Sequence, residues 1–248
     1  MNFIAIIPAR YASTRFPGKP LADVGGKPMV QRVYEQAQRA FAHVFVATDD
    51  ERIAAAVKNF GGKVIMTSAS HRSGTDRCAE AALKAETALG QKFDVVVNVQ
   101  GDEPFIAPLQ LEQLKGCFTD ADVQLATLVK TFGKGEDVFS PNSPKVVVDA
   151  SSHALYFSRS VVPYLRSAAQ AQWPESFPFY KHVGLYAYRT DTLQRICRLP
   201  QSQLELAEEL EQLRWIENGY RIKVAVTELE TWAIDTPEDL EKLKEKFL

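Results

Sequence analysis

Residues 3–21, FIAIIPARYASTRFPGKPL, join a short apolar strand to a loop rich in cations and turn-forming residues. Residues 3–7 carry no charge and are rich in isoleucine, which is typical of a parallel strand buried on both faces. In open α/β sheets, ligands bind just beyond the carboxyl ends of such strands. The stretch therefore predicts an α/β fold with a ligand-binding loop after its first strand.

The loop itself carries three cations, Arg10, Arg15 and Lys19. Guanidinium groups match phosphate oxygens bidentately, and backbone N–H groups near proline and glycine add further donors. Prolines stiffen the loop, while Gly18 permits close backbone approach. A solvated basic loop is the alternative that composition alone leaves open. The order of the residues favours a site for a triphosphate.

Apolar strands alternate with amphipathic helices along the chain, which is the doubly wound pattern. The predicted strands are residues 3–7, 43–47, 63–66 and 95–99, followed later by 145–148, 154–157 and 222–226. Apolar residues recur at helical spacing over 29–37 and 53–60. A capping box at Ser202 predicts a helix that Gly219 closes, and Thr236 before Pro237 predicts the start of the last helix.

Composition excludes several classes of protein. The 248 residues, 46% apolar, suit one large α/β domain with no second full domain, and the net charge of −2 argues against non-specific nucleic-acid binding. Cys78, Cys117 and Cys197 are widely spaced and form no disulfide or zinc pattern. No apolar run is long enough for a signal-peptide core or a membrane span, so we expect a cytoplasmic protein without a membrane partner.

Further motifs follow the loop in a fixed order. They are Ser73-Gly74-Thr75-Asp76-Arg77, Asn98-Val99-Gln100-Gly101-Asp102-Glu103-Pro104, Ala154-Leu155-Tyr156-Phe157-Ser158-Arg159, Lys181-His182-Val183-Gly184, Leu210-Glu211-Gln212-Leu213-Arg214 and Asp235-Thr236-Pro237-Glu238-Asp239-Leu240. With the N-terminal loop, these segments closely resemble the motifs of sugar-activating cytidylyltransferases, in particular the 3-deoxy-manno-octulosonate (Kdo) cytidylyltransferases that make CMP-Kdo for lipopolysaccharide. The resemblance covers nearly the whole chain.

The resemblance implies a Rossmann-like nucleotide-diphospho-sugar transferase fold, with a mixed, mostly parallel sheet and a small dimerisation module. On this interpretation residues 1–131 bind the nucleotide, 132–200 bind the sugar and form a homodimer, and 201–248 complete the active site. Residues 167–178 are unusually apolar for an exposed loop, so Trp173, Phe177 and Phe179 are expected at the dimer interface. The implied substrates are CTP and Kdo, and the implied cofactor is Mg²⁺.

Site residues follow from the loop chemistry and from the matching motifs. The expected catalytic residues are Arg10, Arg15, Lys19 and Asp102. The expected nucleotide-binding residues are Pro8, Ala9, Arg10, Lys19, Ser73, Thr75, Arg77, Gln100 and Gly101. The expected sugar-binding residues are Gln100, Arg159, His182, Glu211 and Gln212, and the expected magnesium ligands are Asp102 and Asp235.

Asp102 and Asp235 also have a purely structural interpretation. Asp102 directly follows the strand 95–99, where an aspartate often serves only a turn. Asp235 precedes Thr-Pro, which is an ordinary helix-start signal. The matching motifs favour metal binding at both positions, because magnesium prefers carboxylate oxygens together with substrate phosphates.

Two other kinds of function remain open at this stage. One is a nucleotidylyltransferase for another sugar, such as a CMP-sialic acid, 8-amino octulosonate or hexose-1-phosphate enzyme, and the other is a nucleotide-binding module without turnover. A dehydrogenase of the Rossmann type is disfavoured because the chain has no G-x-G-x-x-G motif. A P-loop kinase is disfavoured because Pro20 follows Lys19 where that motif needs Ser or Thr.

Overall fold

The computed structural model describes residues 1–12 and 16–247, so the predicted catalytic residue Arg15 lies outside the described residues. The chain divides into two compact units, and each collects segments that are distant in the sequence. The first unit comprises Met1–Glu112, Ala187–Cys197 and Thr231–Leu248, and the second comprises Gln113–Tyr186 and Arg198–Glu230. These boundaries differ from the three consecutive parts, 1–131, 132–200 and 201–248, expected from the sequence.

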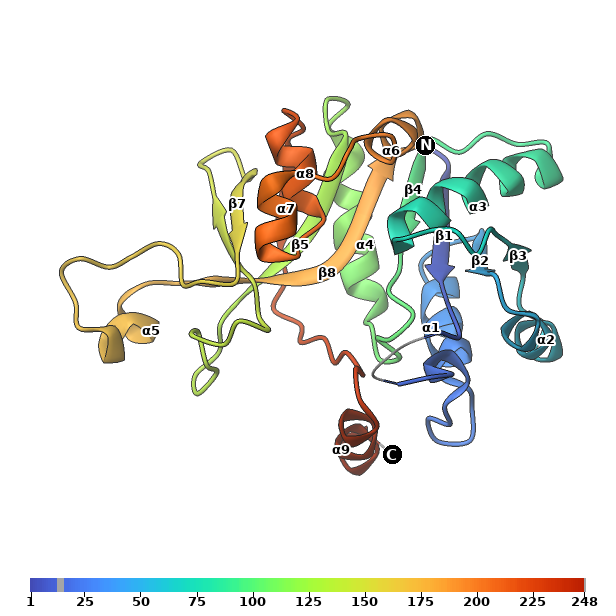
Figure 1. Cartoon of the computed structure of the whole chain (residues 1–248), viewed down its shortest axis with the longest axis horizontal. Helices are drawn as coiled ribbons and strands as arrows, with labels where there is room; N and C mark the ends of the chain where they lie inside the picture. Colours follow the sequence, from blue (N-terminus) through green and yellow to red (C-terminus); the bar gives the residue numbers. More distant parts are fainter. Residues whose placement is uncertain (13–15, 248) are drawn as a thin grey trace. The chain divides into compact units, whose positions relative to one another are not determined.

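Four parallel strands form the centre of the first unit. They are β1 (Phe3–Pro8), β2 (Val44–Thr48), β3 (Val64–Met66) and β4 (Val95–Asn98), in the spatial order β3-β2-β1-β4. Every residue of β2 and β4 is buried, which explains their uninterrupted apolar sequences. Figure 1 shows β1 beside β4. The chain moves away from β1 in one direction and returns on its other side, so the switch point lies between β1 and β4.

Helices cover this sheet and complete the first unit. They are η1 (Lys19–Leu21), α1 (Met29–Gln38), α2 (Glu51–Asn59), α3 (Gly74–Leu89), α6 (Thr190–Ile196) and α9 (Pro237–Phe247). The helix α3 contacts β1 and β4, and α6 packs against α3. The expected cap of α9 is confirmed, because Asp239 N–H donates to Thr236 Oγ1 at 3.2 Å. The boundaries between the units fall within α4 (Pro108–Gly116) and β8 (Tyr180–Arg189).

The second unit mixes parallel and antiparallel strands. Its strands are β5 (Leu125–Thr131), β6 (Lys145–Val148), β7 (Ala154–Ser158), β9 (Ile222–Val226) and most of β8. β5 pairs with β9 in parallel, whereas β6 pairs antiparallel with β7 and β8. Its helices are η2 (Cys117–Thr119), η3 (Gln170–Gln172), α5 (Trp173–Ser176), α7 (Gln203–Glu208) and α8 (Gln212–Glu217). The expected α/β class with a mixed, mostly parallel set of strands is confirmed.

One predicted helix is in fact two. The Ser202 capping box is present and starts α7, but that helix ends at Glu208. Glu209 adopts the left-handed conformation, with φ of 50°, and α8 starts at Gln212. The capping box and Gly219, from which a single helix is predicted, do not reveal this break, because a non-glycine residue seldom takes a positive φ.

The aromatic residues expected at a dimer interface also differ in their surroundings. Trp173 and Phe179 are each 2% exposed and form a core cluster with Val138, whereas Phe177 is 38% exposed. The indole N–H of Trp173 donates to the carbonyl of Ala168 at 3.0 Å. The apolar composition of this segment therefore reflects burial within the chain at Trp173 and Phe179, which does not support the expectation that these two residues lie at a dimer interface.

Replacing Trp173 with alanine should destabilise the protein strongly. Truncating a buried tryptophan leaves a cavity and costs about 3–5 kcal/mol, whereas Phe177→Ala at a partly exposed site should cost about 1 kcal/mol or less. Urea denaturation followed by circular dichroism measures both losses. Equal, small losses in the two variants would contradict the burial of Trp173.

Candidate functional site

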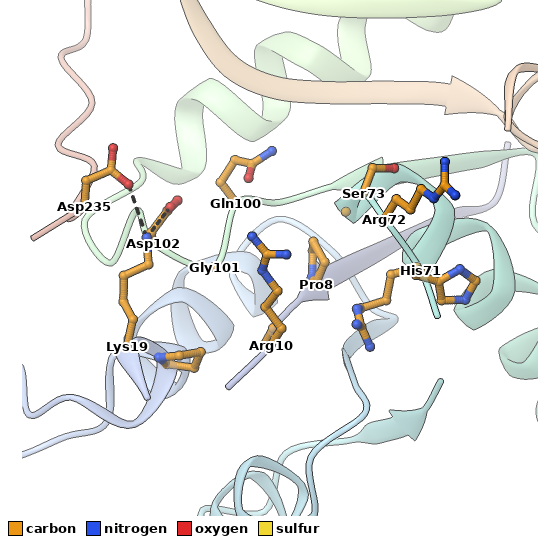
Figure 2. Close-up of a pocket in the computed structure, with 14 residues that line it drawn as sticks. Pro8, Arg10, Lys19, His71, Arg72, Ser73, Gln100, Gly101, Asp102 and Asp235 are labelled. Carbon is orange, nitrogen blue, oxygen red and sulfur yellow. Dashed lines mark hydrogen bonds and ion pairs between the residues drawn. The ribbon is translucent and has the colours of Figure 1, made fainter. Parts of the chain in front are cut away.

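A cavity of about 260 Å³ lies in the first unit, beyond the carboxyl ends of β1 and β4. Its lining residues are Pro8, Ala9, Arg10, Lys19, Pro20, His71, Arg72, Ser73, Gly74, Arg77, Gln100, Gly101, Asp102 and Asp235. Figure 2 shows how the labelled side chains converge on it from segments that are far apart in the sequence. The location is the topological switch point, where open α/β sheets bind their ligands.

Lys19 joins three of these segments. Its ammonium group donates to Asp102 Oδ2 at 2.8 Å and to the carbonyl of Ile234 at 2.9 Å, and it lies 3.4 Å from Asp235 Oδ1 (Figure 2). The Lys19 side chain is only 16% exposed, so these contacts are partly shielded from water. From the sequence we expect Asp102 and Asp235 to lie close together. In the structure both carboxylates contact the Lys19 ammonium group.

Ile234 fixes the position of Asp235. Its side chain is fully buried in a cluster with Val24, Met29 and the α9 residue Leu240. Its N–H group donates to the carbonyl of Asp102 at 2.9 Å. The segment before α9 is therefore attached to the loop after β4 through a backbone hydrogen bond as well as through Lys19.

Two glycines allow the loops around the cavity to pack closely against Pro8. A Cβ atom on Gly101 would lie 2.9 Å from the carbonyl oxygen of Pro8, and one on Gly74 would lie 3.3 Å from its Cγ. The first distance is shorter than real Cβ contacts, so any larger residue at position 101 would push the loops after β1 and β4 apart. The glycine between Gln100 and Asp102 thus sets the spacing of the two loops.

The amino terminus of α3 forms another wall of the cavity. Ser73 caps this 16-residue helix by accepting a hydrogen bond from Asp76 N–H at 3.1 Å. Arg77, also in the wall, is 4% exposed and donates to Thr67 Oγ1 at 2.6 Å, with Asp49 Oδ1 at 3.1 Å. Thr75, expected to bind nucleotide, is buried and does not line the cavity.

Of the residues expected to bind the sugar, Gln100 lines this cavity, and the other four lie in the second unit. Arg159 donates through its guanidinium to the carbonyls of Glu208 at 2.6 Å, Pro141 at 2.9 Å and Glu209 at 3.4 Å. Glu208 also accepts from Ser158 Oγ at 2.7 Å. Arg159 therefore fastens the end of α7 to β7.

His182 lies on β8, Glu211 directly precedes α8, and Gln212 is the first residue of that helix. The His182 ring lies 5.1 Å from the Tyr186 ring, and its Nε2 lies 3.0 Å from Thr127 Oγ1. Burial lowers the pKa of His182 to about 3, so its imidazole is neutral at pH 7. Glu211 accepts from Arg214 at 3.0 Å, and its charge helps raise the pKa of Tyr186, which burial raises most.

Gln212 is 4% exposed, and its Nε2 has no hydrogen-bond partner among the described residues. A buried amide donor without a partner is costly, which makes this group a candidate to bind a ligand acceptor.

Comparison with known proteins agrees with this geometry. A family model described as cytidylyltransferase matches residues 4–223. A 3-deoxy-manno-octulosonate cytidylyltransferase from Parabacteroides distasonis is 62% identical over 246 residues, which cover 98% of this chain and 96% of the relative. One from Bacteroides thetaiotaomicron is 59% identical over 251 residues, covering 100% and 98%. The chain belongs to the 3-deoxy-manno-octulosonate cytidylyltransferase family.

A solved structure of a CMP:2-keto-3-deoxy-manno-octonic acid synthetase complexed with CTP matches this family member with a TM-score of 0.90 at 45% identity, covering 99% of this chain and 98% of the other. A structure of a glucose-1-phosphate thymidylyltransferase from Bacillus anthracis, at 17% identity and a TM-score of 0.61, shares the fold alone. The expected family and fold are therefore both confirmed.

Sequence reasoning missed four residues that line the cavity of this cytidylyltransferase: Pro20, His71, Arg72 and Gly74. Gly74 was part of a matching motif but was given no role. His71 and Arg72 directly precede that motif, so their position two residues or fewer from Ser73 was the available signal.

Glu103, beside Asp102, is 5% exposed. Burial, with a smaller contribution from the Asp102 carboxylate, raises the pKa of Glu103 to about 8. The side chain is therefore mainly a neutral carboxylic acid at pH 7. It adds no negative charge to the pocket beyond that of Asp102 and Asp235.

The elevated pKa of Glu103 predicts a pH-dependent stability. The folded state binds this proton more tightly than the unfolded state, so stability falls as pH rises from about 4.5 to about 8, by at most about 1.4 kcal/mol per pH unit. Glu103→Gln removes this contribution to the pH dependence of stability, because glutamine does not titrate. Urea denaturation at several pH values should show the variant gaining stability relative to the wild type across this window.

Near pH 4 both side chains at position 103 are uncharged, which provides the reference for the comparison. A stability difference that stays constant from pH 4 to pH 9 would show that the Glu103 pKa is not elevated.

Proposed function

We propose that the protein transfers CMP from CTP to the anomeric hydroxyl of 3-deoxy-D-manno-octulosonate, giving CMP-Kdo and pyrophosphate for lipopolysaccharide biosynthesis. The observation that carries the proposal is the meeting of Lys19, Asp102 and Asp235 in the cavity at the switch point. The relatives named above support it, since their names specify the same sugar acid and one of them was solved with CTP.

The reaction makes one phosphorus–oxygen bond and breaks another. The sugar hydroxyl oxygen attacks the α-phosphorus of CTP and loses its proton, and pyrophosphate leaves with the electron pair of the broken bond. Such reactions need mainly positioning and stabilisation of negative charge. Arg10 and Lys19 line the cavity and supply positive charge to it. We assign Arg10 and Lys19 to the triphosphate. We assign Gln100 to contacts with both the nucleotide and the sugar.

For the sugar acid we propose the four second-unit residues expected from the sequence. The unpartnered amide of Gln212 supports this assignment, because a sugar hydroxyl or carboxylate oxygen would satisfy it. His182, being neutral, offers a hydrogen bond and no charge. The Glu211 carboxylate accepts hydrogen bonds, and we assign it to the sugar hydroxyls. In this structure Arg159 contributes by holding the adjoining end of α7.

We further propose that the protein uses Mg²⁺. Among the described residues, no three His, Cys, Asp or Glu side chains gather to hold a metal. However, Asp102 and Asp235 both reach the single ammonium of Lys19, so the pair is spaced to contact one cation. Two carboxylates suit magnesium when substrate phosphates and water supply the remaining oxygens. When bound there, the ion would neutralise charge that develops on the phosphates.

The homodimer is also a proposal. Tyr164 is 72% exposed and Phe177 is 38% exposed, and their rings pack on the buried Trp173 and Phe179 at 4.9 and 5.0 Å. Exposed aromatic rings held by buried ones are suited to an interface with a second copy. Sedimentation of the wild type as a monomer at working concentration would contradict it.

No helix in the described parts of the chain is long and apolar enough to cross a membrane. As a separate proposal, we place the protein in the cytoplasm.

Pyrophosphate release tests the proposed reaction directly. The assay combines Mg²⁺ and each of several nucleoside triphosphates with Kdo, its 8-amino analogue, sialic acid and glucose 1-phosphate. We expect release to require CTP together with Kdo. Faster release with another sugar would assign the protein to another nucleotidylyltransferase, and no release with any pair would favour a binding module without turnover.

Replacing either carboxylate with asparagine should lower activity without loss of the fold. Asp102→Asn or Asp235→Asn keeps the size of the side chain but removes the anionic ligand, so kcat should fall on the order of 100-fold. Raising the magnesium concentration should partly restore the rate by mass action. A magnesium titration of the initial rate measures this response.

Asp239→Asn is the matched control for Asp235. Asp239 stands in the same helix start and accepts from the N–H groups of Asp235 and Thr236 at 3.2 and 3.0 Å, but it does not line the cavity. Its replacement should cost about 1 kcal/mol of stability and leave the magnesium response unchanged. If Asp235→Asn behaves in the same way, Asp235 serves only the start of α9.

A further inference from the structure

The segment 67–73 forms one end of the cavity. His71, Arg72 and Ser73 line it, and Figure 2 shows them on the opposite side from Lys19, Asp102 and Asp235, with Pro8, Arg10 and Gly101 between. If the triphosphate lies along the cations and carboxylates, as proposed above, the nucleoside extends toward segment 67–73. The position of this segment then decides how well the nucleoside fits.

Glu80, on α3, holds this segment from behind. Its carboxylate accepts from the backbone N–H of Ser68 at 2.9 Å and contacts Nε2 of His71. It also pairs with Lys84 at 2.7 Å, and Lys84 in turn donates to the carbonyl of Met66 at 2.8 Å. One carboxylate thus connects α3 to the segment at residues 68 and 71, and Lys84 connects α3 to Met66, the last residue of β3.

These contacts keep the Glu80 carboxylate charged. Burial alone would raise the pKa of Glu80, but hydrogen bonds from Lys84, Ser68 and His71 lower it to about 2. Arg77 adds a separate attachment at Thr67, through the 2.6 Å hydrogen bond to Thr67 Oγ1. Thr67 N–H also donates to the carbonyl of Thr48 at 2.8 Å. The start of the segment is therefore fixed independently of Glu80, whereas Ser68 and His71 depend on it.

We propose that Glu80 is a positioning residue for nucleotide binding, which holds His71 and the segment 67–73 in place as the nucleoside end of the cavity. Glu80 itself does not line the cavity, so it acts through the segment. The proposal rests on the proposed function, because it takes CTP as the ligand. It predicts that Glu80 affects recognition of the nucleoside and leaves recognition of the phosphates unchanged.

Binding of CTP and of inorganic tripolyphosphate separates these two effects. Glu80→Ala should weaken CTP binding about tenfold, since it removes hydrogen bonds to a charged group, whereas tripolyphosphate affinity should change less than about twofold. Glu80→Gln keeps an acceptor for Ser68 N–H, so its loss should be smaller. Isothermal titration calorimetry with full-length protein and Mg²⁺ measures all of these affinities.

Glu86 provides the matched control on the same helix. It is 6% exposed, accepts from Phe93 N–H at 3.0 Å and pairs with Lys92 at 2.7 Å, so it makes the same kinds of contact away from the cavity. Glu86→Ala should lower the melting temperature at least as much as Glu80→Ala while leaving CTP affinity unchanged. In turnover assays, Glu80→Ala should raise KM for CTP about tenfold with kcat and KM for Kdo within about twofold.

Three results would overturn the proposal. They are unchanged CTP affinity in Glu80→Ala, equal loss of CTP and tripolyphosphate affinity, and an equal loss of CTP affinity in Glu86→Ala. A wild-type protein that binds no CTP would contradict the proposed function as well, whereas the other results leave that function standing.

Discussion

The rest of the site depends on the contacts of the Lys19 ammonium group with Asp102, Ile234 and Asp235. It connects the loop after β1 with the loop after β4 and with the segment before α9, where Asp102 and Asp235 stand 83 and 216 residues after Lys19. In the described structure the Lys19 ammonium contacts both the Asp102 and the Asp235 carboxylates. Because both carboxylates reach one cation, the pair also suits the Mg²⁺ ion proposed above, which carboxylates and phosphates bind together.

The fold brings this charge cluster to a defined place. β1 and β4 are buried parallel neighbours, and their carboxyl ends open toward the same cavity. Gly101 lets the two following loops approach at Pro8, and the buried Ile234 holds Asp235 against them. The chemistry thus rests on backbone spacing as much as on charge, because a shift of either loop would separate Lys19 from its carboxylates.

Much of this could be predicted from sequence. The uninterrupted apolar run before Pro8 marked a buried parallel strand, and the cations after it marked the ligand loop. Asp102 was recognisable because it follows a strand. Asp235 was recognisable only through the family motif, because its own sequence, Asp-Thr-Pro, is an ordinary helix start.

The remainder depended on tertiary contacts that no local pattern reports. Glu80 and His71 are nine residues apart, and only the path of the segment before α3 brings them together. Trp173 lies in an apolar, proline-containing stretch, and that composition alone could not distinguish burial within the chain from an exposed interface. Arg159 matched a sugar-binding motif, but its guanidinium donates to three backbone carbonyls, which a motif does not encode.

The central claim is that the switch-point cavity of the first unit binds the nucleotide triphosphate. Hydrogen–deuterium exchange with and without CTP and Mg²⁺ tests it most directly, because it locates protection along the backbone. The account predicts slower exchange in residues 18–22, 73–77, 99–103 and 232–236 when CTP is bound. Protection confined to other parts of the chain, with these four segments unchanged under saturating CTP, would contradict it.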